Sequence, residues 1–179
     1  MDGAAILRNA ALGAVAGIAA SLVMDGVQAG VGAVQKRLSS QDEEGGDDSS
    51  ENSTVKAADR VSEAATGHPV PQDQKKAAGT AVHFGFGALL GAIYGAAGAA
   101  FPIVRSGFGL PFGAGVWAAA DEVLVPAAGL TKPPTEVPAS EQASYLAMHL
   151  VFGAALEGSL RLLDTGLDQL SDGESRRDR

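Results

Sequence analysis

The stretch AAGTAVHFGFGALLGAIYGAAGAAF at residues 77–101 contains no Asp, Glu, Lys or Arg. A helix of about 20 mostly apolar residues is long enough to cross the hydrocarbon core of a bilayer. A soluble amphipathic helix of this length would carry a polar stripe along one face. The stretch therefore predicts a transmembrane helix. An Ala-rich soluble bundle is the alternative interpretation, because the mean hydropathy of the chain is only +0.10.

Three further apolar stretches lie at residues 10–34, 107–129 and 143–163. Together they predict an all-α fold, an integral membrane bundle of about four transmembrane helices that forms a single domain over residues 1–179. The first stretch could instead be a signal peptide, since Arg8 precedes it. Its apolar character continues past Asp25 to Lys36 and Arg37, which is longer than a signal sequence and favours an uncleaved anchor.

One long polar loop, residues 35–76, separates the first two predicted spans. Its segment 41–53 holds six acids and no base, so the rest of the chain has a net charge of only about -2 out of the total of -8. Such an acidic run with Gly and Ser is typical of disorder. Residues 54–65 read as a short amphipathic helix, with Gly67 suited to the position after its end. Residues 164–179 are predicted to form a flexible charged tail.

Composition and motifs exclude several function classes. The chain has no cysteine, so it has neither disulfides nor thiolate metal sites. It lacks a phosphate-binding loop, a nucleophile elbow and a dinucleotide fingerprint. It also lacks a basic patch interleaved with aromatic residues, so nucleic acid is not an expected partner. The expected partner is the lipid bilayer, with a second copy of the chain or another membrane protein as further possibilities.

A repeat of four residues that includes glycine occurs in two of the predicted spans. Gly87, Gly91 and Gly95 follow His83 at this spacing, and Gly153 lies midway between His149 and Glu157. Residues four apart share one face of a helix. In membranes such small-residue faces allow two helix backbones to approach closely. Both histidines are therefore expected to point toward neighbouring helices rather than lipid.

Ionisable residues are costly inside a membrane and are usually functional. In a four-span antiparallel bundle, a rise of about 1.5 Å per residue places several of them at a similar depth from one side. These are His83, His149, Asp121 and Glu122, with Asp25 somewhat deeper. Asp121 and Glu122 are adjacent in sequence, so at most one of them can point squarely inward. Glu157 is expected near the opposite face.

Three roles fit this polar layer. It could handle protons or ions, because histidine titrates near neutral pH. It could be a network that only fixes helix packing, as in a membrane scaffold or assembly protein. It could hold a divalent metal through His83, His149 and Glu122. No two ligands share a helix at metal-binding spacing, so the metal signal is weak; no other cofactor is indicated, and an enzyme is not favoured. The two histidines are expected to share one network with Asp121 or Glu122.

Several segments carry a resemblance to a known family. They are TVKAADRV at 54–61, AGTAVHFGFGA at 78–88, AADE at 119–122 with Val125 and Pro126, LTKPPTEVP at 130–138, and HLVFG at 149–153 reaching Glu157. Over residues 55–163 the chain resembles the YagU-like family of bacterial inner-membrane proteins, whose function is unknown. The resemblance implies a multi-pass protein of the bacterial plasma membrane and little chemistry. The acidic run at 41–53 looks particular to this chain.

Overall fold

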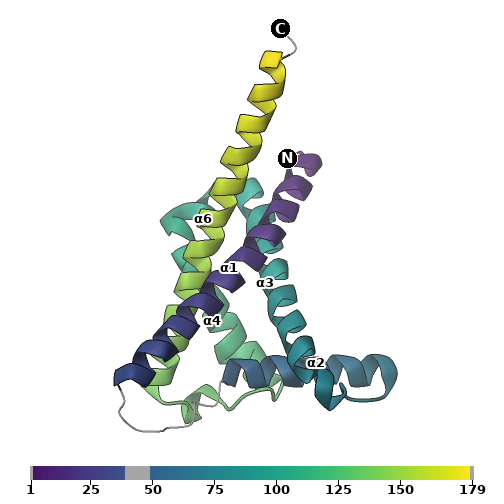
Figure 1. The fold of residues 1–179 in the computed structure, drawn as a ribbon, viewed down its shortest axis with the longest axis vertical. Helices are drawn as coiled ribbons and strands as arrows, with labels where there is room; N and C mark the ends of the chain where they lie inside the picture. Colours follow the sequence, from purple (N-terminus) through teal and green to yellow (C-terminus); the bar gives the residue numbers. More distant parts are fainter. Residues whose placement is uncertain (1, 39–48, 178–179) are drawn as a thin grey trace.

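The computed structural model describes residues 2–38 and 49–177, and these contain helices but no strand, which confirms the all-α prediction (Figure 1). The principal helices are α1 (Gly3–Leu38), α2 (Ser49–Thr66), α3 (Lys75–Ala100), α4 (Leu110–Ala119) and α6 (Ala139–Arg177). Shorter elements are η1 (Gln72–Gln74), η2 (Pro102–Gly109), η3 (Ala120–Leu124), α5 (Val125–Ala127) and η4 (Pro134–Glu136).

Four segments are long and apolar enough to cross a membrane, as the sequence predicted. They are Gly3–Leu38, Gln72–Ala100, Pro102–Ala127 and Ala139–Leu167. The start of α1 and the end of α6 lie at one end of the bundle, and α2 lies across the other end (Figure 1). An even number of spans brings both ends of the chain to the same side.

Two element boundaries differ from the sequence prediction. Helix α2 begins at Ser49 rather than residue 54, so residues 49–53 of the segment 41–53 predicted to be disordered are helical. The rest of that segment, residues 41–48, lies outside the described residues. Helix α6 continues to Arg177 rather than ending near Leu163. Most of the extra turns are polar, so the apolar pattern gave no reason to extend the helix. Flexibility of the tail stays a prediction.

Helices α1 and α3 approach so closely that their backbones touch. A methyl group added at Gly13 would meet the carbonyl oxygen of Gly91, and one added at Gly17 would meet that of Gly87. Gly95 faces the backbone of Asn9 in the same way. The glycines of α3 at four-residue spacing therefore lie against α1. Only the absence of side chains allows this separation.

A second seam joins α4 to α6. A methyl group at Gly113 would meet the carbonyl of His149, and one at Gly153 would meet that of Gly109. The buried apolar core lies where the seams meet, around Ala16, Ala20, Tyr94, Phe152, Leu156 and Leu160. Because backbone contact sets these positions, side chains on neighbouring turns are held at defined places across the bundle.

Helix α2 ties the start of α3 to the end of α5. Asp59 accepts hydrogen bonds from the Val70 amide at 3.1 Å and from Lys75 Nζ at 2.8 Å. Arg60 donates to the carbonyl of Ala128, one of the unpaired carbonyls expected at a helix end. The helix ends at Gly67, whose φ of 79° suits a residue without a Cβ. Together these contacts hold α2 across the bundle end.

Candidate functional site: two polar clusters at opposite ends of the bundle

A cavity of about 490 Å³ lies in the half of the bundle nearer α2. Its lining comes from α1, α2, α3, α4, η3, α5 and α6, so all four spans contribute. Four ionisable side chains of the predicted layer line it, and we call it the polar cavity for them: Asp25, His83, Asp121 and His149. A volume of this size is in the usual range for small-molecule pockets.

The first histidine of the polar cavity pairs with α1. His83 Nε2 lies 3.1 Å from Asp25 Oδ1. The carboxylate is half-exposed, whereas the imidazole side chain is 27% exposed. The approach lacks hydrogen-bond alignment, so within the described residues the buried Nε2 atom of His83 has no hydrogen-bond partner. The two side chains are close enough to interact electrostatically, but no hydrogen bond fixes their geometry.

The second pair joins α6 to an irregular turn. His149 Nδ1 lies 3.5 Å from Asp121 Oδ2 and 2.9 Å from the carbonyl oxygen of Tyr145. Asp121 lies in η3, a single π-helical segment over Ala120–Leu124 inserted between α4 and α5. Short π segments inside helices are frequent at functional sites. Here the insertion lies where the carboxylate meets the imidazole.

The hydrogen bond to Tyr145 determines where His149 carries its proton. A backbone carbonyl can only accept, so Nδ1 must be the donor. In a neutral imidazole the other nitrogen, Nε2, is then an unprotonated base. His149 lines the cavity, so the ring that would accept a proton belongs to its wall.

The structure divides the predicted polar layer rather than joining it into one network. Asp25, His83, Asp121 and His149 do line one cavity, but each histidine has its own carboxylate partner. Glu122 is half-buried beside Asp121 and does not line the cavity. The two residues lie about 100° apart on a helix, which lets only one of them face inward.

The metal interpretation finds no support. Among residues 2–38 and 49–177, no group of three or more His, Asp or Glu side chains is placed to hold a metal ion. The proposed trio of His83, His149 and Glu122 fails because Glu122 is outside the cavity and the histidines face different partners. The described residues therefore offer paired acids and bases rather than a coordination site.

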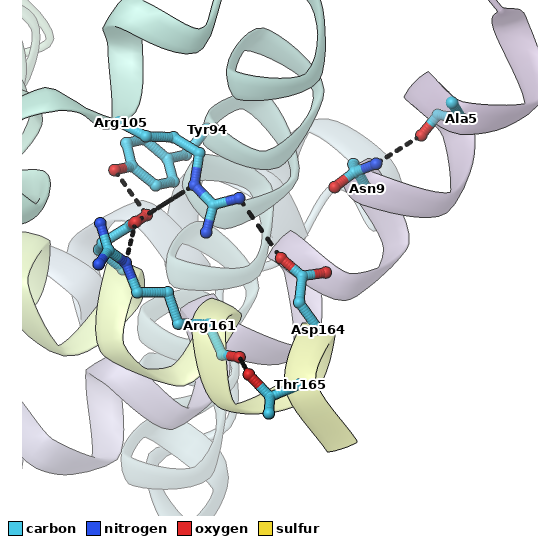
Figure 2. Close-up of polar contacts among 8 residues, drawn as sticks. Ala5, Asn9, Tyr94, Arg105, Arg161, Asp164 and Thr165 are labelled. Carbon is cyan, nitrogen blue, oxygen red and sulfur yellow. Dashed lines mark hydrogen bonds and ion pairs between the residues drawn. The ribbon is translucent and has the colours of Figure 1, made fainter. Parts of the chain in front are cut away.

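A second polar cluster lies at the opposite end, around the fully buried Glu157. Its carboxylate accepts from Tyr94 Oη at 3.0 Å, from Arg105 Nε at 3.0 Å and from Arg161 Nε at 2.6 Å. Arg105 also donates to Asp164 at 3.3 Å. Figure 2 shows the two arginines and Tyr94 converging from separate elements. These five residues form the Glu157 cluster, whose two arginines balance its two carboxylates.

Four members of this cluster were not predicted from the sequence. Tyr94 and Arg105 come from α3 and η2, and their approach to Glu157 depends on the tight turn between α3 and α4. That turn places Phe108 at a φ of 55°, unusual for a residue with a side chain, and Arg161 lies over its ring at 5.1 Å. Only Arg161, four residues after Glu157, had a local sequence signal.

Four apolar helices around a buried polar interior define the class of a multi-pass helical membrane protein. The chain belongs to the family described as "Protein of unknown function (DUF1440)", which it matches over residues 60–158. No curated protein and no solved structure matches the chain. The matched region contains His83, Asp121, His149 and Glu157, whereas Asp25 precedes it.

Proposed function

We propose that this is a multi-pass protein of the bacterial inner membrane, of the YagU-like kind, that takes up and releases protons at the polar cavity. One observation carries the proposal. Two histidine–carboxylate pairs, Asp25–His83 and Asp121–His149, line a single cavity among membrane-spanning helices. Charged groups in such positions are costly and are generally associated with ion or proton pathways.

The geometry supports the uptake step at named atoms. His149 Nε2 is the free base of the ring, since Nδ1 is committed to the Tyr145 carbonyl. A proton taken up there makes an imidazolium that Asp121 Oδ2 stabilises at 3.5 Å. His83 and Asp25 form a second station of the same kind at 3.1 Å. Release reverses each step, and the carboxylates keep the imidazolium ions from being stranded in apolar surroundings.

Proton flux in liposomes tests this function. The purified chain would be reconstituted with a trapped pH-sensitive dye, and a potassium diffusion potential would drive protons inward from an external medium at pH 6. We expect dye acidification faster than in protein-free liposomes, and at least tenfold slower flux for His149→Gln and Asp121→Asn. Glu122→Gln is the matched control, because it removes a neighbouring carboxylate that does not line the cavity. Flux equal to that of protein-free liposomes would overturn the proposal.

A non-catalytic membrane scaffold is the second candidate, favoured by the Glu157 cluster. Its charges are fully paired and tie η2 to α6, and the hydrogen bond from Tyr94 adds α3, which fixes packing without any binding site. In this function the partner would be a second copy of the chain or another membrane protein. Chemical crosslinking in native membranes, together with normal stability and absent proton flux, would favour the scaffold.

A further inference from the structure

The charged lining of the polar cavity is one-sided. Its ionisable groups are Asp25 from α1, His83 from α3, Asp121 from η3, and Tyr145 and His149 from α6. Helix α2 contributes Ser53 and Thr54 but no charge, and no Lys or Arg is among the described lining residues. The cavity therefore carries two negative charges when both imidazoles are neutral. It approaches neutrality when both are protonated.

Most of the remaining wall is apolar. Met24, Phe86, Leu90, Val116, Met148 and Phe152 supply large aliphatic and aromatic surfaces. These groups are interleaved with the titratable residues along the helices, because Phe86 follows His83 on α3 and Phe152 follows His149 on α6 by less than one turn. A ligand that fills this space needs an apolar body as well as a charge.

We propose that the polar cavity binds an amphipathic organic cation, a molecule with one positive centre and an apolar body, in exchange for protons. The exchange rests on the proton-handling function proposed above, whereas the binding does not. The volume of about 490 Å³ suits a ligand of drug-like size. The cationic centre would lie between Asp25 and Asp121, with its body against the aromatic and methionine side chains.

Other ligand classes fit the lining less well. An anion would meet two carboxylates and no Lys or Arg. A bare metal ion lacks a cluster of three ligands in the described residues. A neutral lipid chain would displace water from the carboxylates without compensating them, which is costly. A cation with an apolar body satisfies both parts of the wall at once.

The exchange follows from charge balance. With neutral imidazoles, the two carboxylates attract the cation. When protons enter and both rings become imidazolium ions, each carboxylate is neutralised by its own histidine partner, at 3.1 Å and 3.5 Å. The bound cation then loses its counter-charges and leaves. No covalent bond changes. Two protons enter for each monovalent cation that leaves, so the cavity goes from one net negative charge with the cation bound to none with both rings protonated.

Binding of tetraphenylphosphonium to the full chain in lipid nanodiscs tests this inference, with the isosteric anion tetraphenylborate as the charge control. We expect saturable cation binding at pH 8 that weakens at least tenfold at pH 5. Asp25→Asn and Asp121→Asn should each weaken it at least tenfold at pH 8, whereas Glu122→Gln should bind as wild type. Calorimetry in two buffers of different ionisation heat should report proton release at pH 7. Asp25 is half-exposed, so its variant carries the test if Asp121→Asn does not fold.

The outcomes separate this inference from the proton function. Equal saturable binding of the anion, or unchanged cation binding in both carboxylate variants, would overturn the cation site. Proton flux without any cation binding would also overturn it while leaving the proposed function standing. Cation binding with neither proton release nor proton flux would support the site and overturn the exchange.

Discussion

The two ends of the bundle treat buried charge in opposite ways. Glu157 is fully buried, accepts from three donors and has two arginines as counter-ions. The polar cavity instead contains two separate histidine–carboxylate pairs whose carboxylates are 50% and 30% exposed. Arginine is effectively always charged, whereas histidine titrates near neutral pH. The Glu157 cluster is therefore permanently charged and paired, whereas the polar cavity can change its charge while the fold persists.

Helix α1 also meets its neighbours differently along its length. Gly13 and Gly17 of α1 lie against the backbone of Gly91 and Gly87 on α3, and Gly87 also lines the polar cavity. Toward the polar cavity, Gly26 and Gly30 have no neighbouring atom within 4 Å in the described structure. Backbone contact along α1 therefore reaches the wall of the polar cavity at Gly17, whereas the helix beyond it has open space around Gly26 and Gly30.

The largest expected effect comes from removing the buried charge of the Glu157 cluster. Glu157→Gln leaves Arg161 without its counter-charge and leaves Arg105 with Asp164 alone. Breaking a buried pair costs roughly 3–5 kcal/mol, and the partial exposure of Arg161 favours the lower figure. Asp25→Asn should cost less than about 1 kcal/mol, since that carboxylate is half-exposed. Reversible unfolding in a maltoside–dodecyl sulfate titration measures both variants. Equal losses of unfolding free energy in the two variants would contradict the distinction between the Glu157 cluster and the Asp25–His83 pair.

A methyl group added to α1 should change stability differently in the two halves of that helix. Gly13→Ala would push against the backbone of Gly91, and overpacking of this kind costs about 1–3 kcal/mol. Gly30→Ala enters open space, where alanine is about 1 kcal/mol better than glycine in a helix. The same unfolding titration should show loss for the first variant and none for the second. A similar loss of stability from both variants would show that the half of α1 that contains Gly30 is also packed against a neighbour.

Acid should release α2 from the end of the bundle. The hydrogen bond from Lys75 lowers the pKa of Asp59, which outweighs the opposing effect of partial burial. A lowered folded pKa means that the contribution is present above the unfolded value of 3.8 and is lost as pH falls through the folded value. A dye attached to Val61→Cys, at an exposed site of a chain without cysteine, should lose fluorescence anisotropy as the pH falls below 3.8.

Asp59→Asn provides the control for this acid transition. It removes the charge that Lys75 pairs with, so the labelled helix should already be mobile at pH 7 and should lose its response to acid. Release of α2 near pH 6 in the parent chain would instead mean that a group other than Asp59 governs its docking.

The spans and the shared depth of the cavity residues followed from the sequence because both depend on local quantities. Length and apolar content define a span, and the rise per residue gives the depth of His83 or His149. The pairing did not follow. Asp121 rather than Glu122 faces the cavity, in a π segment for which the alternating small and apolar residues give no signal. Assigning each histidine its own partner requires the crossing of the helices, which sequence periodicity does not contain.

The Glu157 cluster could not be predicted from the sequence for a different reason. Glu157 was expected at the opposite face, but its partners Tyr94 and Arg105 reach it only through the chain reversal at η2. The left-handed conformation of Phe108 in that reversal has no marker in the sequence, unlike Gly107 and Gly109 beside it. Contacts that depend on such a chain reversal cannot be predicted from the sequence pattern and are found only in the three-dimensional structure.

The smallest expected effect tests whether the polar cavity holds two pairs or one network. Residues in contact couple by about 0.5 kcal/mol or more in a double-mutant cycle, whereas separate sites add within about 0.3–0.5 kcal/mol. The cycle Asp25→Asn with His83→Gln joins partners 3.1 Å apart, and the cycle His83→Gln with His149→Gln joins residues with different partners. Unfolding at pH 6 should show coupling in the first cycle and additivity in the second. At pH 8 the first coupling should shrink, because a neutral ring no longer pairs with the carboxylate. Strong coupling between the two histidines would restore the single shared network that the sequence suggested, and the comparison between the Glu157 cluster and two independent pairs would have to be redrawn.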